Sequence, residues 1–203
     1  MKTSSYSIPV SMMRQWTFCP RVVFFREVMR VAPTSPLWVE QGIENHVRQA
    51  MLEKRRGLRR FGLDGYEKMF NVTLKSETLG IHGIVDGILK GESDIHVLEF
   101  KPSAESVPPA YWIQATGYGL IAAEHFGLPL QGIHILCGKK GKTVSRVGNE
   151  LATAIDAARR VIAEIRECIE CGLMPASSAS DAKCIQCEFV NFCNDRNLVY
   201  ELE

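Results

Sequence analysis

The sequence predicts a mixed α/β domain with one central β-sheet flanked by helices. Towards both ends of the chain, apolar residues recur every three or four positions, which is the period of an amphipathic helix. Between these ends, short apolar runs bounded by polar or glycine-containing turns predict strands. The chain has 203 residues, 46% hydrophobic and 23% charged, a composition typical of a globular protein with a sizeable core. We therefore expect a single domain over residues 1–203.

Four segments predict helices. They span residues 10–30, 33–60, 107–128 and 149–172. Ser11 is a suitable N-cap for the first helix, and Cys19-Pro20 interrupts its pattern. In the second, four apolar residues share one face: Val39, Ile43, Val47 and Met51. The third helix begins at a proline pair and ends near Gly127.

Five segments predict strands. They span residues 69–76, 79–90, 94–101, 131–138 and 142–148. A polar segment around Glu77 separates the first two strands, and the turn GESD separates the second from the third. The order of helix, hairpin-rich sheet, helix, strands and helix favours one sheet covered by helices.

Two charged residues interrupt the third predicted strand, HVLEFK. If the turn GESD is a four-residue hairpin loop, Lys90 pairs with Ile95 and Asp86 lies directly opposite Glu99. Lys101 shares the face of Glu99 because side chains alternate along a strand. Opposed residues have Cβ atoms about 4.5–5.5 Å apart, so the two carboxylates repel one another.

The neighbours of these charges are apolar on both faces, so we expect the hairpin to be buried on both sides. They are Ile84, Val85, Ile88, Leu89, Val97, Leu98 and Phe100. A divalent cation such as Mg²⁺ between Asp86 and Glu99 would remove the cost of burying two carboxylates. Lys101 beside it could polarise a water or stabilise charge on a phosphate. The alternative is a structural ion-pair network at a solvent-facing edge.

Three further residues fit such a site. Gln114 and Tyr118 are four positions apart on one face of the third helix, where they could hold a phosphate or orient Lys101. His46, in the second helix, can bind a metal as a neutral imidazole. A tyrosine at helical spacing is more often a core residue, and a lone histidine beside an apolar stripe is usually a packed one.

Seven cysteines are many for a chain that we expect in the cytoplasm, since it shows no apolar signal segment and no run long enough to span a bilayer. In a reducing compartment, clustered cysteines indicate a metal or cluster site rather than disulfides. The pairs Cys168-x₂-Cys171 and Cys184-x₂-Cys187 have a spacing close to that of a zinc ribbon, so zinc is an alternative. Cys137 is expected to be a buried thiol.

The formal net charge is only +1, but basic residues form two clusters that could contact phosphates or simply be solvated. The dense cluster comprises Lys54, Arg55, Arg56, Arg59 and Arg60, and the looser one Lys139, Lys140, Lys142 and Arg146. The second cluster approaches a phosphate-binding P-loop. However, Leu136 stands where that motif needs glycine, and the turn joins two strands, so no ATP site is expected.

Taken together, four motifs resemble the series found in RecB-like nucleases of the PD-(D/E)xK superfamily. They are Gly42–His46, Gly83–Gly87, Glu99–Lys101 and Gln114–Tyr118. The cysteines add to this resemblance: Cys19 early in the chain and Cys184-x₂-Cys187-x₅-Cys193 late resemble the iron–sulfur nucleases. A short chain with both sets resembles the fourth family of CRISPR-associated (Cas) proteins over about residues 10–195.

This resemblance implies a RecB-like nuclease core and a metal-dependent exonuclease that acts on single-stranded DNA. The implied polarity is 5′-to-3′, and the enzyme could also cut as an endonuclease. It implies that Mg²⁺ or Mn²⁺ is bound by His46, Asp86, Glu99 and the Phe100 carbonyl. Lys101 would act on the nucleophilic water, and Gln114 and Tyr118 would support the active site.

The resemblance also implies an iron–sulfur cluster, [4Fe–4S] rather than [2Fe–2S], in a cap formed by about residues 10–30 and 172–203. Its ligands would be Cys19, Cys184, Cys187 and Cys193. The implied role is to trim and select prespacers with the CRISPR integrase complex, acting on single-stranded DNA or prespacer overhangs without membrane or ATP. Two alternatives are a non-catalytic scaffold that holds DNA ends and a RecB-like nuclease of DNA repair.

Overall fold

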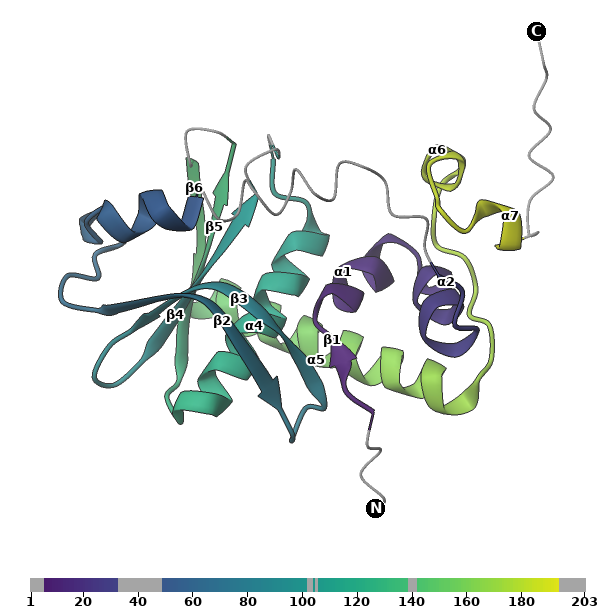
Figure 1. Cartoon of the computed structure of the whole chain (residues 1–203), viewed down its shortest axis with the longest axis horizontal. Helices are drawn as coiled ribbons and strands as arrows, with labels where there is room; N and C mark the ends of the chain where they lie inside the picture. Colours follow the sequence, from purple (N-terminus) through teal and green to yellow (C-terminus); the bar gives the residue numbers. More distant parts are fainter. Residues whose placement is uncertain (1–5, 33–48, 102–103, 105, 139–141, 194–203) are drawn as a thin grey trace, which may run out of the picture.

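A six-stranded mixed sheet forms the centre of the computed structural model, which describes residues 6–32, 49–101, 104, 106–138 and 142–193. Its strands are β1 (Ile8–Pro9), β2 (Glu67–Ser76), β3 (Ile81–Lys90), β4 (Ile95–Lys101), β5 (Leu130–Cys137) and β6 (Lys142–Val147). The order is β1-β3-β4-β5-β6, with β2 also paired to β3 (Figure 1). The pairs β1·β3 and β4·β5 are parallel, and the others are antiparallel.

Helices lie before, between and after the strands. They are α1 (Ser11–Phe18), α2 (Pro20–Val23), the π-helical η1 (Phe24–Val28), the 3₁₀ turn η2 (Arg59–Phe61), α4 (Pro109–Phe126), α5 (Gly148–Cys171), α6 (Asp181–Ile185) and α7 (Val190–Cys193). Residues 49–55 are also helical. The predicted mixed α/β architecture is therefore confirmed, and each predicted strand is found to within two residues.

The β4–α4–β5 unit sets the geometry of the sheet centre. Parallel strands need a crossover, and α4 supplies it. This helix begins after Pro108, whose backbone is extended, and ends at Gly127, whose φ of 63° is in the left-handed region that favours glycine. Because α4 connects two adjacent parallel strands, it lies across the sheet, and its buried residues pack against Val97, Ile133 and Ile135.

The two faces of the sheet pack against different parts of the chain. On one face, Val97, Ile133 and Ile135 pack with α1, α4 and α5 in the largest hydrophobic cluster. On the other, Leu98 and Phe100 pack with residues of the segment 50–63. Because Glu99 lies between Leu98 and Phe100 in β4, its side chain is on the α4 face.

A third hydrophobic cluster joins the N-terminal helices, residues 11–28, to the C-terminal segment 179–193, and we call these two segments the joined chain ends. The ring of Phe25 in η1 stacks on that of Phe189, with centroids 5.6 Å apart. Phe189 is 1% exposed, and Cys19, Cys184, Cys187 and Cys193 belong to the same cluster. In Figure 1, α6 and α7 lie beside α2 at the end of the molecule away from β6.

The structure corrects two details of the sequence analysis. Ser11 is not the N-cap of α1: Val10 holds that position, without a side-chain cap. Ile84 is 56% exposed rather than buried: the next residue, Val85, is 0% exposed in the largest hydrophobic cluster, and the alternation of side chains along a strand directs Ile84 to the other face. The predicted break at Cys19-Pro20 is confirmed, since Cys19 is extended and Pro20 begins α2. Most of the predicted helix 33–60 lies outside the described residues.

None of the helices within the described ranges combines the length and the apolar character that a bilayer crossing requires.

Candidate nuclease site

Asp86 and Glu99 lie side by side in the centre of the sheet. The ladder between β3 and β4 runs from Lys90↔Ile95 to Gly87↔Leu98, which confirms the predicted four-residue turn and ends one residue short of Asp86 and Glu99. The Phe100 backbone N–H donates a hydrogen bond of 2.8 Å to Asp86 Oδ2. The two acids are only 8% and 2% exposed, so both carboxylates are held in a largely dry environment.

Lys101 supplies a positive charge beside these acids. Its Nζ lies 2.5 Å from Glu99 Oε1, and its side chain is 15% exposed. The same ammonium lies 5.2 Å from the centroid of the Tyr111 ring, at the start of α4. The lysine is therefore held at the rim of the site by a carboxylate and an aromatic face.

From α4, Gln114 and Tyr118 face this row of charges. Gln114 Nε2 donates to the Tyr118 hydroxyl at 3.3 Å, whereas Gln114 Oε1 is buried and has no hydrogen-bond partner among the described residues. Burial raises the pKa of Tyr118, and Glu99 and Asp86 add to the effect. The close approach requires Gly83, since a Cβ there would lie 2.7 Å from Tyr118 Cε1.

The four cysteines expected to bind an iron–sulfur cluster belong to one hydrophobic cluster, but within the described residues no three of them are grouped as a metal site. The Cys187 thiol interacts electrostatically with Cys19, Cys184 and Cys193, and burial raises its pKa. Arg21 ties this region together: its Nε donates to the Pro175 carbonyl at 2.8 Å, and its guanidinium lies 3.3 Å from Cys193 Sγ.

Of the other late cysteine pair, Cys168 belongs to the same hydrophobic cluster as these four cysteines. Cys168 and Cys171 are in the last turn of α5, and the electrostatic partner of the Cys168 thiol is Cys171. Burial raises the pKa of Cys168, and its Sγ lies 3.8 Å from the Leu173 carbonyl oxygen. Cys137 is a buried thiol in β5, as predicted.

A family model of the PD-(D/E)XK nuclease superfamily matches residues 13–194 of the chain. The chain is also 38% identical over 190 residues to the CRISPR-associated exonuclease Cas4 of Francisella tularensis subsp. novicida (strain U112), covering 94% of this chain and 95% of that protein. The chain belongs to the Cas4 family of PD-(D/E)XK nucleases. The Cas4 exonuclease of Aeropyrum pernix is 28% identical over 200 residues, with 91% and 94% covered.

The fold of this nuclease is also that of a solved structure. The crystal structure of SSO0001 matches it with a TM-score of 0.50 and 16% sequence identity, over 96% of this chain and 88% of that one. The likeness shows that the two chains share a fold.

Use of a divalent metal ion is typical of the superfamily, and the donors of this nuclease suit a hard cation. Asp86 and Glu99 offer carboxylate oxygens, and Gln114 Oε1 is an unpartnered oxygen on the facing helix. Within the described ranges, no three His, Cys, Asp or Glu side chains are grouped as a metal site. The predicted ligand His46 lies outside these ranges.

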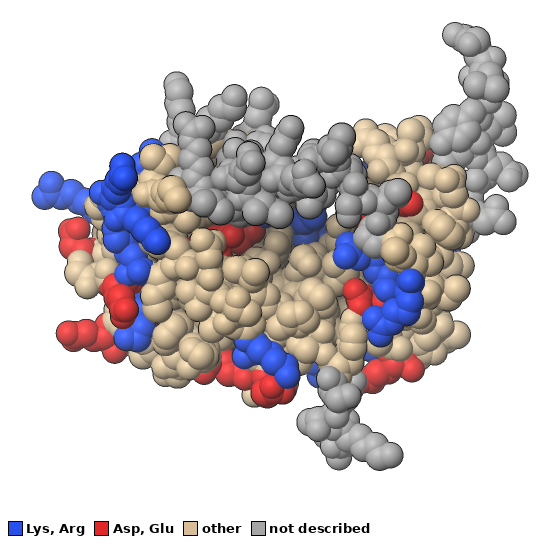
Figure 2. Space-filling model, viewed as in Figure 1, with Lys and Arg blue, Asp and Glu red and all other residues tan. Residues whose placement is uncertain are grey.

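The dense basic cluster of the nuclease lies on the opposite face of the sheet from the carboxylates, since it belongs to the segment that covers Leu98 and Phe100. In Figure 2, Lys and Arg side chains gather at the left, where this segment lies in Figure 1. Arg56 and Arg60 both pair with Glu53, which is 3% exposed. Contact of the exposed Lys54, Arg55 and Arg59 with DNA stays a prediction.

Sequence reasoning missed two residues near the site. Tyr111 contacts Lys101, and Arg14 of α1 interacts electrostatically with Tyr118. Tyr111 could have been found from its position one helical turn before Gln114. Arg14 could not, because it reaches the site only through the packing of α1 on α4.

Proposed function

We propose that this nuclease digests single-stranded DNA from the 5′ end with the help of Mg²⁺ or Mn²⁺. The proposal depends mainly on one observation, the buried row of Asp86, Glu99 and Lys101 facing Gln114 and Tyr118. The names of the relatives, CRISPR-associated exonucleases, support exonuclease activity connected with CRISPR. Within that activity, trimming and selecting prespacers for the CRISPR integrase is the role that we propose.

Hydrolysis of a phosphodiester forms a bond from a water oxygen to phosphorus and breaks the bond to the leaving sugar oxygen, which takes up a proton. The Lys101 ammonium is positioned to hold that water or to stabilise the negative charge that develops on the phosphate. Asp86, Glu99, the Phe100 carbonyl and His46 would hold the divalent ion. When bound, the ion supplies Lewis-acid chemistry by withdrawing charge from the phosphate.

The four-cysteine region supports an iron–sulfur cluster, [4Fe–4S] in our proposal. Cys19, Cys184, Cys187 and Cys193 belong to one hydrophobic cluster, and the Cys187 thiol interacts with the other three. Thiolates in an apolar setting are the usual ligands of such clusters. A bound cluster would fasten the two chain ends across the nuclease core as a cap, and its binding energy would add to folding stability.

We propose a location in the reducing cytoplasm, where clustered cysteines serve as metal or cluster ligands rather than as disulfides. The integrase complex and prespacer overhangs are the partners that we propose; the name of the relative supports only an exonuclease associated with CRISPR.

The first experiment is digestion of 5′- and 3′-labelled single-stranded DNA by anaerobically purified protein with Mn²⁺, with Mg²⁺ and with chelator. Lys101→Ala should lower the rate by about a hundredfold or more, because general acid–base or electrostatic groups contribute at least that much. Lys90→Ala, at the other end of the adjacent strand and with a half-buried side chain, is the matched control and should keep the wild-type rate.

Digestion without added metal, or an unchanged rate in Lys101→Ala, would contradict the proposed site. If wild type and Lys101→Ala both bind DNA and neither cleaves it, a scaffold that holds DNA ends explains the protein better.

A further inference from the structure

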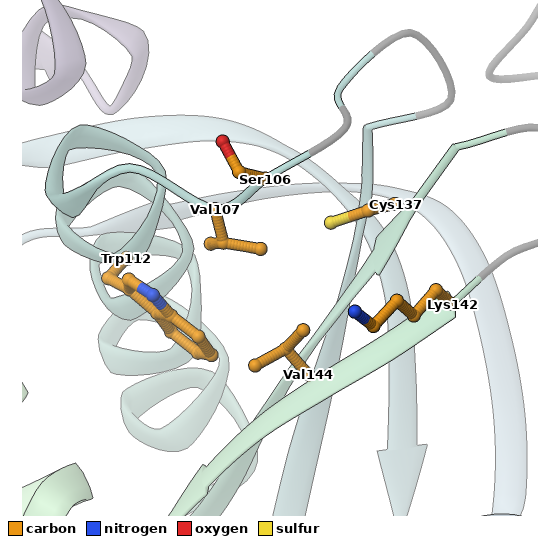
Figure 3. Close-up of a pocket in the computed structure, with 6 residues that line it drawn as sticks. All are labelled: Ser106, Val107, Trp112, Cys137, Lys142 and Val144. Atoms are coloured by element: carbon orange, nitrogen blue, oxygen red, sulfur yellow. The ribbon is translucent and has the colours of Figure 1, made fainter.

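A pocket of about 290 Å³ opens between the start of α4 and the strands β5 and β6 (Figure 3). Its lining residues are Ser106, Val107, Trp112, Cys137, Lys142 and Val144. The volume is at the lower end of the range for small-molecule sites, about 300–1,000 Å³, so the pocket suits one small group.

The pocket adjoins the candidate catalytic row. In the sheet, Lys101 pairs with Cys137, and Cys137 pairs with Lys142, so these three residues form one row across β4, β5 and β6. Paired residues on neighbouring strands point to the same face. Because Cys137 lines the pocket and is the strand partner of Lys101, the pocket lies next to Lys101.

The chemistry of the lining favours an anionic ligand with a flat apolar part. Val107, Val144 and the indole of Trp112 supply apolar surface, whereas Lys142 is the one charged residue among the six that line the pocket. Arg146 lies on the same face of β6, two residues after Val144. Its guanidinium carbon is 4.3 Å from the centroid of the Trp112 ring. A nucleotide combines these two features, since its base is flat and its phosphate is anionic.

The position of the two basic clusters points to the same ligand. The dense cluster lies on the far face of the sheet, with two of its arginines engaged by Glu53. Lys142 and Arg146, from the looser cluster, lie on the face of Glu99 and Lys101.

We propose that this pocket is a subsite for one nucleotide of the DNA strand that is being cut. Its base enters between Val107, Val144 and Trp112, and its phosphate lies at Lys142 and Arg146. The inference rests on the proposed function, because it takes the strand to pass Lys101.

The first test fills the pocket. Val144 is 36% exposed on an edge strand, so Val144→Phe adds volume at the pocket without entering the main core. Val147→Phe is the matched control, because Val147 is 52% exposed on the same strand and points to the opposite face. Binding of a fluorescent oligothymidylate is measured by anisotropy in chelator, where no cleavage is expected, and thermal melting verifies folding.

We expect Val144→Phe to weaken binding about fivefold or more, since a lost base contact costs at least that much. Val147→Phe should bind like wild type. Equal affinities for the two variants, whether both are normal or both weakened, would overturn the subsite.

The second test removes the charge of the pocket. Lys142→Ala should reduce the slope of log K against log salt by about 0.7, the value for one phosphate contact on a single strand. Lys75→Ala removes an exposed charge from β2 and should leave the slope unchanged. An unchanged slope in Lys142→Ala would overturn the phosphate contact.

A titration with thymidine monophosphate tests whether the pocket binds a nucleotide within a DNA strand or a free nucleotide. If Val144→Phe abolishes binding of the monophosphate and leaves the oligonucleotide unaffected, the subsite serves free nucleotide and our proposal is wrong. Because these measurements need no cleavage, they decide on the pocket even if the wild-type protein does not digest DNA.

Discussion

Two buried histidines on the face of the sheet away from the carboxylates make the stability of the protein depend on pH. His96 Nδ1 lies 3.1 Å from His134 Nε2, and His134 Nδ1 lies 2.7 Å from Ser145 Oγ. Burial lowers the pKa of His134 to about 3, with further lowering by His96 and Arg60. Burial also lowers the pKa of His96, partly offset by Asp94. Both imidazoles are therefore neutral in the folded protein near pH 7.

The size of the effect follows from His134 alone. An unfolded histidine has a pKa of about 6.5, so below that pH the unfolded chain binds a proton that folded His134 does not. Its contribution to stability is fully present above pH 6.5 and is lost progressively as the pH falls towards 3. Between pH 8 and pH 5.5 the free energy of unfolding should decrease by about 1.4 kcal/mol on account of His134. His96 acts in the same direction.

The assay is urea unfolding at pH 8 and at pH 5.5 for wild type, His134→Gln and His125→Gln. His125 is exposed at the end of α4, so its replacement should keep the wild-type pH dependence. Removal of His134 should reduce the difference between the two pH values by about 1.4 kcal/mol, since carboxylate effects are shared by all three proteins. A wild-type pH dependence in His134→Gln would refute this reasoning.

Two further predictions concern the joined chain ends. Phe189→Ala should lower the free energy of unfolding by about 3–5 kcal/mol, because Phe189 is 1% exposed and stacked on Phe25. The measurement is urea unfolding, with Phe192→Ala as the control because Phe192 is exposed. Equal losses of stability in the two variants would contradict the packing of Phe189. Cys193→Ala should lose the brown absorbance of the proposed cluster and unfold at a lower temperature, and nuclease activity should be lost as a consequence. A colourless variant with normal stability and normal activity would exclude a structural cluster.

The candidate catalytic row could be predicted because it depends on local rules. The length of the turn GESD predicted the pairing of Lys90 with Ile95, which the ladder confirms. Counting along the strands then predicted Asp86 next to Glu99, and the hydrogen bond from the Phe100 N–H to Asp86 shows that the two segments are adjacent there. Gln114 and Tyr118 followed from helical spacing. Each step needed only neighbouring residues and one assumed turn.

Features that depend on contacts between distant segments could not be predicted in this way. The His96–His134 pair forms only because β4 and β5 become neighbours through the α4 crossover. The sequence shows five basic residues from Lys54 to Arg60, but not that the buried Glu53 engages two of them. Ile84 is exposed although the adjacent Val85 is fully buried, and apolar character alone does not show this difference.

The division between the two faces of the sheet bears on the path of a DNA strand. The row of Lys101, Cys137 and Lys142 runs across β4, β5 and β6, and β6 is the edge of the sheet. A strand that follows this row would pass from the carboxylates to the edge while staying on one face, with a positive charge at each end of the row. A strand that used the dense basic cluster would have to pass around the sheet to its other face. The shorter path leads through the pocket at Trp112, so removal of Lys142 should affect binding more than removal of any single exposed residue of the dense cluster.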